Sequence, residues 1–153
     1  MKILLICTGN TCRSTMAEVL LRQIIASDST SVDVEVYSAG LAAIEGMPAT
    51  EQAIKVMQEK GLNLSNHSSR LVSPDLLEAD LILTMTLRHK QVLLRANSKL
   101  AEKTFTLKEY AGEKQELDIL DPYGGSVDVY RATAEEIQKY LELAWERLTA
   151  GSS

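Results

Sequence analysis

The sequence lacks the features of disulfide-linked, zinc-binding and membrane-spanning proteins. Only two of its 153 residues are cysteines, too few for a disulfide framework or a complete zinc site. No apolar stretch is long enough to cross a bilayer, and the N-terminal segment lacks a basic region of any length and the cleavage site of a secretion signal. We therefore expect a cytoplasmic protein that does not associate with a membrane.

Positive charge is also scarce. Lysine and arginine number 16 against 21 aspartates and glutamates, which gives a net charge of −5. Such a balance argues against nucleic acid or an anionic membrane as a partner, so an anionic substrate must be attracted by a local field. The length and the 45% hydrophobic content fit one globular domain. We expect it to occupy residues 1–150, with 151–153 as a tail, and to be a monomer.

Apolar strand-like segments alternate with amphipathic helical segments along the chain. This alternation predicts a single-domain α/β fold, a four-stranded parallel sheet flanked by helices on both faces in the Rossmann-like manner. The predicted strands are residues 2–7, 32–37, 80–85 and 103–107. The predicted helices are residues 15–26, 50–59, 88–95 and 132–148, with a short helix opening at Ser73-Pro74. Thr15 and Glu18 have the spacing of a capping box at the start of the first helix.

The run from Cys7 to Ser14, CTGNTCRS, connects the first predicted strand to the first predicted helix. A helix N-terminus favours negative charge because its backbone N–H groups and its dipole point at the preceding loop. That field stabilises a thiolate at Cys7, and the guanidinium of Arg13 matches phosphate oxygens. The loop also follows the carboxyl end of a strand, where α/β sheets bind ligands. We interpret it as a phosphate-transfer site that uses cysteine.

Nucleophilic attack on phosphorus requires a proton donor for the leaving group. The best candidate is Asp121, because Pro122 restricts it to extended geometry and Gly124-Gly125 permits a tight turn after it. Asp118 and Asp128 are the alternative candidates.

Four segments resemble the low-molecular-weight protein tyrosine phosphatase family. They are the CTGNTCRS loop, Tyr37-Ser38-Ala39-Gly40, Ser65-Asn66-His67 and Asp121-Pro122-Tyr123. The resemblance implies the phosphotyrosine protein phosphatase I-like fold and a phosphocysteine intermediate, without a metal or other cofactor. The sequence departs from the family pattern at Thr15, where proline is usual, and the resemblance assigns no role to His89.

The resemblance also implies roles for individual residues. Cys7 would be the nucleophile, Arg13 would bind the phosphoryl oxygens, and Asp121 would protonate the leaving group and then activate water. The implied substrate-binding residues are Thr8, Gly9, Asn10, Thr11, Cys12, Arg13 and Tyr123. The residues implied to brace the loop are Asn10, Ser14, Ser38 and His67.

Thr11 and Gly124 distinguish two substrate classes within this resemblance. Tyrosine-specific members usually carry an aliphatic residue at the first position and an aromatic residue at the second. The combination in this sequence is similar to the bacterial protein-arginine phosphatases, and the Thr11 hydroxyl and Asp121 carboxylate suit a guanidinium. We therefore expect hydrolysis of the P–N bond of phosphoarginine in phosphorylated protein substrates. The alternative is a low-molecular-weight protein tyrosine phosphatase.

Three other classes fit less well. Arsenate reductases of this fold need further cysteines, and none follows Cys12. A sugar-transport phosphocarrier would not need Arg13 or an Asp-Pro acid, and a phosphate-binding module would tolerate loss of the Cys7 thiol. Two interpretations of Cys12 remain open, a buried packing residue or a partner for a reversible disulfide with Cys7.

Overall fold

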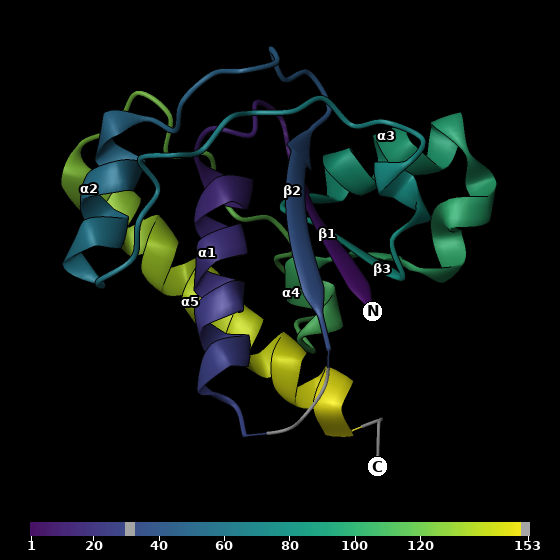
Figure 1. Cartoon of the computed structure of the whole chain (residues 1–153). Coiled ribbons are helices and arrows are strands. Elements are labelled where there is room, and N and C mark those ends of the chain that lie inside the picture. Colours follow the sequence, from purple (N-terminus) through teal and green to yellow (C-terminus); the bar gives the residue numbers. More distant parts are fainter. Residues whose placement is uncertain (30–32, 151–153) are drawn as a thin grey trace.

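The computed structural model describes residues 1–29 and 33–150. Four parallel strands form one sheet in the order β2-β1-β3-β4 (Figure 1). The strands are β1 (Lys2–Cys7), β2 (Glu35–Gly40), β3 (Leu81–Thr84) and β4 (Thr104–Thr106). The helices are α1 (Arg13–Ser27), α2 (Glu51–Glu59), α3 (Leu87–Ala96), α4 (Leu107–Tyr110) and α5 (Val127–Ala150), with 3-10 turns at Leu76–Glu78 and Ser98–Glu102. The predicted four-stranded parallel α/β fold is confirmed.

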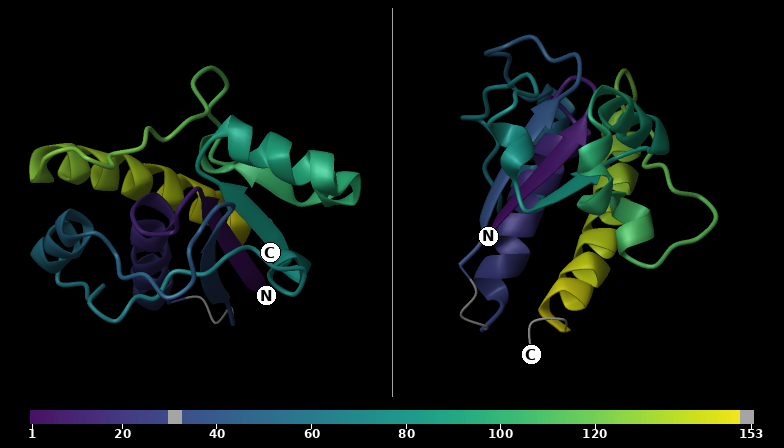
Figure 2. Two further views of the ribbon diagram at one scale, coloured as in Figure 1. Left: turned by 90° about the horizontal axis from the view of Figure 1, so that it is seen from above. Right: turned by 90° about the vertical axis from the view of Figure 1, so that its right-hand side faces the viewer.

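Both faces of the sheet are covered, which explains why β1 is continuously apolar. Ile3 and Leu5 of β1 face a core shared with α1, α2 and α5, whereas Leu4 and Ile6 face a second core that includes Leu93 of α3. The view from above in Figure 2 (left) shows the sheet between the two helical layers. Each of these fully buried side chains contributes about 1.5–3 kcal/mol relative to an exposed one.

The second strand differs most from its prediction. It covers Glu35–Gly40 rather than residues 32–37, and residue 32 lies outside the described residues. Its limits follow from pairing with β1, which aligns Lys2 with Glu35 and Cys7 with Gly40. A Cβ at Gly40 would lie 2.4 Å from the carbonyl oxygen of Thr8, so only glycine permits this approach to the loop after β1.

The predicted capping box at the start of α1 is wrong. The helix begins at Arg13, with Cys12 at the N-cap position and no side-chain cap. Thr15 therefore lies inside the helix, where its buried hydroxyl has no hydrogen-bond partner among the described residues. Glu18 instead forms an ion pair with Arg22 at 2.7 Å. The tight loop before the helix determines where it begins, and it overrides the local capping pattern.

Other helix boundaries reflect caps that the sequence patterns missed. α5 begins at Val127, well before the predicted residue 132, because the hydroxyl of Ser126 accepts a hydrogen bond from the backbone of Val129 at 3.3 Å. The predicted short helix at Ser73-Pro74 is the 3-10 turn Leu76–Glu78. The predicted tail, residues 151–153, lies outside the described residues. Within the described ranges, none of the helices has the length and apolarity needed to cross a membrane.

The strand order places the loop after β1 at a change of direction in the sheet. The chain passes from β1 to β2 on one side and then returns to β3 on the other side of β1. The loops that follow β1 and β2 lie together at the top of Figure 1. Ligands of open α/β sheets bind beyond the carboxyl ends of the strands at such a position.

Candidate active site

The loop after β1 surrounds a pocket of about 210 Å³. Its lining brings together the predicted nucleophile, arginine and acid, although Asp121 follows them by more than 100 residues. The lining residues are Cys7, Thr8, Gly9, Thr11, Cys12, Arg13, Asp121 and Tyr123. The remaining predicted site residues, Asn10, Ser14, Ser38 and His67, form a hydrogen-bonded group behind the loop.

The sulfur of Cys7 receives hydrogen bonds from inside the protein. The backbone N–H of Asn10 donates to Cys7 Sγ at 3.3 Å, and Ser14 Oγ lies 2.9 Å from the same sulfur. Because the Asn10 side-chain amide donates to Ser14 Oγ at 2.9 Å, the Ser14 proton is free to point at the sulfur. Both groups can therefore donate hydrogen bonds to the Cys7 sulfur.

Asn10 holds the loop in shape. It has a positive φ of 57°, a conformation that asparagine tolerates better than most residues, and its side chain is fully buried. Its amide oxygen accepts from the backbone of Arg70 at 2.9 Å, so the amide nitrogen faces Ser14 and Ser38. Its carbonyl oxygen accepts from Nε2 of His67 at 2.6 Å.

The N-terminus of α1 faces the pocket without a side-chain cap. The first backbone N–H groups of a helix lack partners within the helix, and together with the dipole they form an anion site. Arg13, at the first helical position, adds a full positive charge beside them. The site thus has the local positive field that the acidic composition does not supply.

Arg13 is held in place by the loop that carries the candidate acid. Only 5% of it is exposed, and its guanidinium donates to the carbonyl oxygen of Ile119 at 2.8 Å. Its other terminal nitrogen lies 3.6 Å from the carboxylate of Asp121. The backbone of Ile119 donates in turn to Met85, which follows β3, at 2.8 Å. The loop after β1, which carries Cys7, and the loop that carries Asp121 are therefore held against each other through Ile119 and the residue after β3.

Asp121 lies in the expected turn at the mouth of the pocket. Its carboxylate accepts from the backbone of Tyr123 at 3.1 Å, and its side chain is 51% exposed. Gly124 has a φ of 82°, and Gly125 closes the turn through a 2.8 Å hydrogen bond to Pro122. Tyr123 projects at the rim, 73% exposed.

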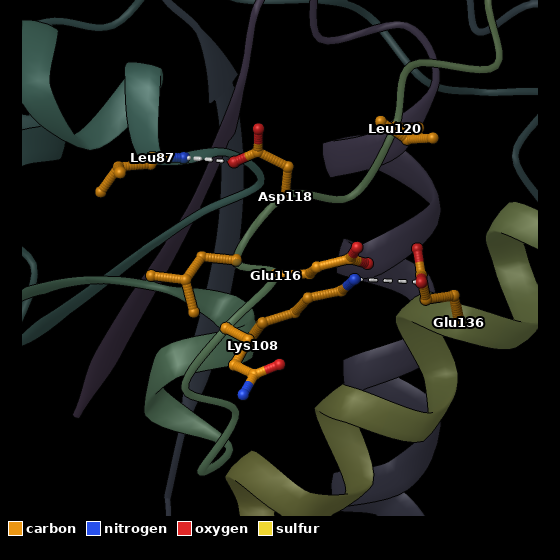
Figure 3. Close-up of a pocket in the computed structure, with 8 residues that line it drawn as sticks. Leu87, Lys108, Glu116, Asp118, Leu120 and Glu136 are labelled. Carbon is orange, nitrogen blue, oxygen red and sulfur yellow. Dashed lines mark hydrogen bonds and ion pairs between the residues drawn. The ribbon is translucent and has the colours of Figure 1, made fainter.

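The alternative acids have other contacts. Asp118 accepts from the backbone of Leu87 at 2.8 Å and lines a separate pocket of about 470 Å³, in which Lys108 and Glu136 form a 3.1 Å ion pair (Figure 3). Asp128 pairs with Arg131 on the surface of α5. Neither lines the pocket of Cys7, which favours Asp121 as the acid.

Cys12 is buried and packs against α5. Its sulfur lies 3.2 Å from the hydroxyl of Tyr130, a fully buried residue. Burial, together with the hydrogen bond to Cys12, raises the pKa of Tyr130 to about 12, so this hydroxyl stays protonated at neutral pH. Both cysteines are free thiols.

His89 is the site residue that the sequence analysis missed. Only 6% of it is exposed, and its Nε2 lies 2.9 Å from the hydroxyl of Thr8. Burial and the nearby charge of Arg13 lower the pKa of His89 to about 4, so its ring is neutral at neutral pH. The one signal in the sequence was its position three residues after Thr86, the spacing of a capping box.

Within residues 1–29 and 33–150, no three histidine, cysteine or carboxylate side chains gather in a way that could hold a metal ion.

Comparison with known proteins identifies the family of this chain. The model of the low molecular weight phosphotyrosine protein phosphatase family matches residues 2–152. The protein-arginine-phosphatase of Bacillus subtilis is 41% identical over 92% of each chain, and the low molecular weight protein-tyrosine-phosphatase PtpB of Staphylococcus epidermidis is 37% identical over 93% of this chain and 95% of its own. A solved structure of the YwlE arginine phosphatase, a mutant with a phosphorylated active-site serine in place of cysteine, superposes with a TM-score of 0.91 at 39% identity, covering 97% of this chain and 96% of that one. With this match along nearly its whole length, the chain belongs to the low molecular weight phosphotyrosine protein phosphatase family.

Proposed function

We propose that this chain is a protein-arginine phosphatase, whose catalytic domain occupies residues 1–150. The observation that carries the proposal is that Thr11 and Asp121 line the same cavity as Cys7 and Arg13. A cationic guanidinium needs hydrogen-bond acceptors, and the Thr11 hydroxyl and one carboxyl oxygen of Asp121 provide them, even when Asp121 carries the proton that it donates later. The names of relatives in Bacillus subtilis and Geobacillus stearothermophilus, both protein-arginine-phosphatase, support the same substrate class.

In the first step the Cys7 thiolate attacks phosphorus, an S–P bond forms and the P–N bond breaks. The electron pair of the P–N bond goes to the guanidino nitrogen, which takes a proton from the carboxylic acid of Asp121. Arg13 and the backbone N–H groups of residues 8–13 stabilise the charge on the phosphoryl oxygens. The hydrogen bonds from Asn10 and Ser14 support this role, because they stabilise the thiolate that attacks and later leaves.

In the second step water attacks the phosphocysteine and gives up a proton to the Asp121 carboxylate. The S–P bond then breaks, releasing inorganic phosphate and restoring the thiolate. The phosphorylated active-site serine in the YwlE mutant supports a covalent intermediate of this kind, since serine there occupies the place of cysteine.

Phosphotyrosine is the second candidate substrate. Tyr123 offers an exposed aromatic ring at the rim of the pocket, and relatives in Staphylococcus are named protein-tyrosine-phosphatases. A phenyl ring packs on apolar side chains, so the preference of the enzyme between the two substrates depends on the polarity of the other side chains that line the pocket.

Thr11→Ile tests the substrate class directly. We expect the parent enzyme to hydrolyse a phosphoarginine peptide with a higher kcat/KM than a phosphotyrosine peptide of the same flanking sequence. The variant should lose phosphoarginine turnover and gain phosphotyrosine turnover, which lowers the ratio of the two kcat/KM values by about 10²-fold or more. The reason is that a site built to hydrogen-bond its substrate discriminates strongly against a substrate that cannot form those hydrogen bonds. Steady-state kinetics on the two peptides measure both constants.

A parent enzyme that prefers phosphotyrosine would contradict the proposed function. An unchanged preference in Thr11→Ile would remove Thr11 from the explanation of that preference.

Cys12 is proposed to protect the nucleophile from oxidation. Peroxide converts a thiolate to a sulfenic acid, which condenses with a neighbouring thiol to a disulfide and releases water. After a peroxide pulse, the parent should recover its activity in excess dithiothreitol, whereas Cys12→Ser should recover much less because Cys7 proceeds to irreversible acids. Equal recovery of the two proteins would leave Cys12 only its packing contact with Tyr130.

We further propose that the enzyme is a cytoplasmic monomer that acts on phosphorylated proteins and not on nucleic acid. Its free thiols suit a reducing compartment, and its net charge of −5 disfavours nucleic acid.

A further inference from the structure

The side chain of Thr8 is the part of the pocket wall that neither the predicted mechanism nor the Thr11 hypothesis uses. Thr8 lies directly after the nucleophile, is exposed and lines the pocket. Its hydroxyl nevertheless has a buried partner, Nε2 of His89 at 2.9 Å. Although Thr8 is exposed, its hydrogen bond to the buried His89 fixes the orientation of its hydroxyl toward a ligand in the pocket.

The neighbours of His89 determine which atom donates in this contact. The backbone N–H of Thr86 donates to Nδ1 of His89 at 3.2 Å, so Nδ1 carries no proton. The lowered pKa of His89 keeps the ring neutral, and its single proton therefore lies on Nε2. His89 donates, and the hydroxyl oxygen of Thr8 accepts.

This polarity leaves the Thr8 hydroxyl with one proton and one lone pair for the pocket. The hydroxyl cannot turn its own proton toward His89, because a proton already lies between the two atoms. The position of His89 is also well determined, since its backbone N–H donates to the Thr86 hydroxyl at 3.1 Å at the start of α3.

We infer that Thr8 is a second specificity-determining residue of this enzyme and that His89 is the positioning residue that orients its hydroxyl. The inference rests on the proposed function, because it concerns how phosphoarginine is distinguished from phosphotyrosine.

The chemistry of the two substrates explains the assignment. A phosphoguanidine places a phosphoryl oxygen, which accepts, beside a guanidinium N–H, which donates. The oriented Thr8 hydroxyl matches that pair with its free proton and its free lone pair. Phosphotyrosine places an aromatic C–H where the guanidinium has N–H, so only one of the two hydrogen bonds remains.

Thr8→Val and Thr8→Ser test the hydroxyl. Thr8→Val keeps the shape of the side chain, and it should lower kcat/KM for a phosphoarginine peptide by about 10-fold or more, the effect of losing a hydrogen bond to a charged group. The loss for a phosphotyrosine peptide should be smaller by several-fold, because that substrate loses only the hydrogen bond to its phosphoryl oxygen, whereas phosphoarginine loses both. Thr8→Ser retains the hydroxyl and should recover most of the phosphoarginine turnover that Thr8→Val loses.

His89→Asn and His89→Gln form a matched pair for the positioning role. Both amides can accept from the backbone of Thr86 and so preserve the start of α3, but only glutamine is long enough to donate to Thr8. We expect His89→Asn to reproduce the selective loss of Thr8→Val, and His89→Gln to restore turnover. The double variant Thr8→Val/His89→Asn should be no worse than Thr8→Val, because both changes remove the same interaction.

The outcomes separate this inference from the proposed function. A parent enzyme without a phosphoarginine preference overturns both. A parent with that preference, together with equal losses on both peptides or no loss in Thr8→Val, overturns the role of Thr8 alone. Additive effects in the double variant, or equal activity of His89→Asn and His89→Gln, overturn the positioning role of His89.

Discussion

Replacing Cys7 with alanine should reduce turnover of every phosphorylated substrate by at least about 10⁴-fold, since loss of a covalent nucleophile removes the reaction path itself. Cys7 is buried at the base of the pocket, where its sulfur is in contact with Ser14 Oγ and the backbone N–H of Asn10. Alanine has no nucleophilic atom to take the place of this sulfur. The remaining phosphate-binding groups should still hold the substrate. We therefore expect kcat to collapse while the dissociation constant for inorganic phosphate changes little.

Two measurements make the test specific. Rapid acid quench with ³²P-labelled substrate should trap a protein-bound phosphoryl group in the parent and none in Cys7→Ala. Thermal unfolding should show that the variant remains folded. Undiminished hydrolysis by a folded Cys7→Ala protein would end the proposal of cysteine-based phosphate transfer, and phosphate binding without turnover by the parent would indicate a binding module.

Asp121→Asn should lower kcat by about 10²–10⁴-fold, the usual contribution of a general acid–base group. The amide preserves the hydrogen bond from the backbone of Tyr123 but cannot deliver a proton. The loss should be large for phenyl phosphate and much smaller for p-nitrophenyl phosphate, because the more acidic phenol leaves without protonation. A series of aryl phosphates measures this dependence.

Asp128→Asn is the matched control for this experiment. Asp128 is the surface carboxylate that pairs with Arg131, and its side chain is 89% exposed. We expect its turnover to remain within about twofold of the parent, as for surface changes remote from a site. An equal loss for good and poor leaving groups in Asp121→Asn would argue against proton donation and for a binding role of the carboxylate.

The strand, loop and helix that carry Cys7 and Arg13 were predictable because they are contiguous. An apolar run, a turn and an amphipathic segment follow one another within β1 and α1, so local patterns describe them. The capping box at Thr15 failed for a related reason. It is a local pattern too, but the hydrogen bonds of Asn10 to Ser38, His67 and Arg70 constrain the loop and shift the start of the helix.

The acid was found in the sequence only through its turn and through the family resemblance. No local pattern around Asp121 indicates that it approaches Arg13. That proximity arises because the backbone of Ile119 is hydrogen-bonded both to Arg13 and to Met85, the residue after β3. Asp118, an alternative candidate in the sequence, is held away from the pocket by its hydrogen bond to the backbone of Leu87 at the start of α3.

The sequence by itself determined the α/β class, the cysteine-and-arginine loop and the choice of chemistry, because hydrophobic periodicity and reactive residue types are properties of adjacent positions. The tertiary structure alone decided how Asp121 comes to lie beside Arg13, what holds Asn10 in its positive-φ conformation, and that His89 contacts Thr8 from 81 residues away. Such contacts depend on strand order and register, which bring distant residues to one edge of the sheet, and no local pattern encodes that proximity.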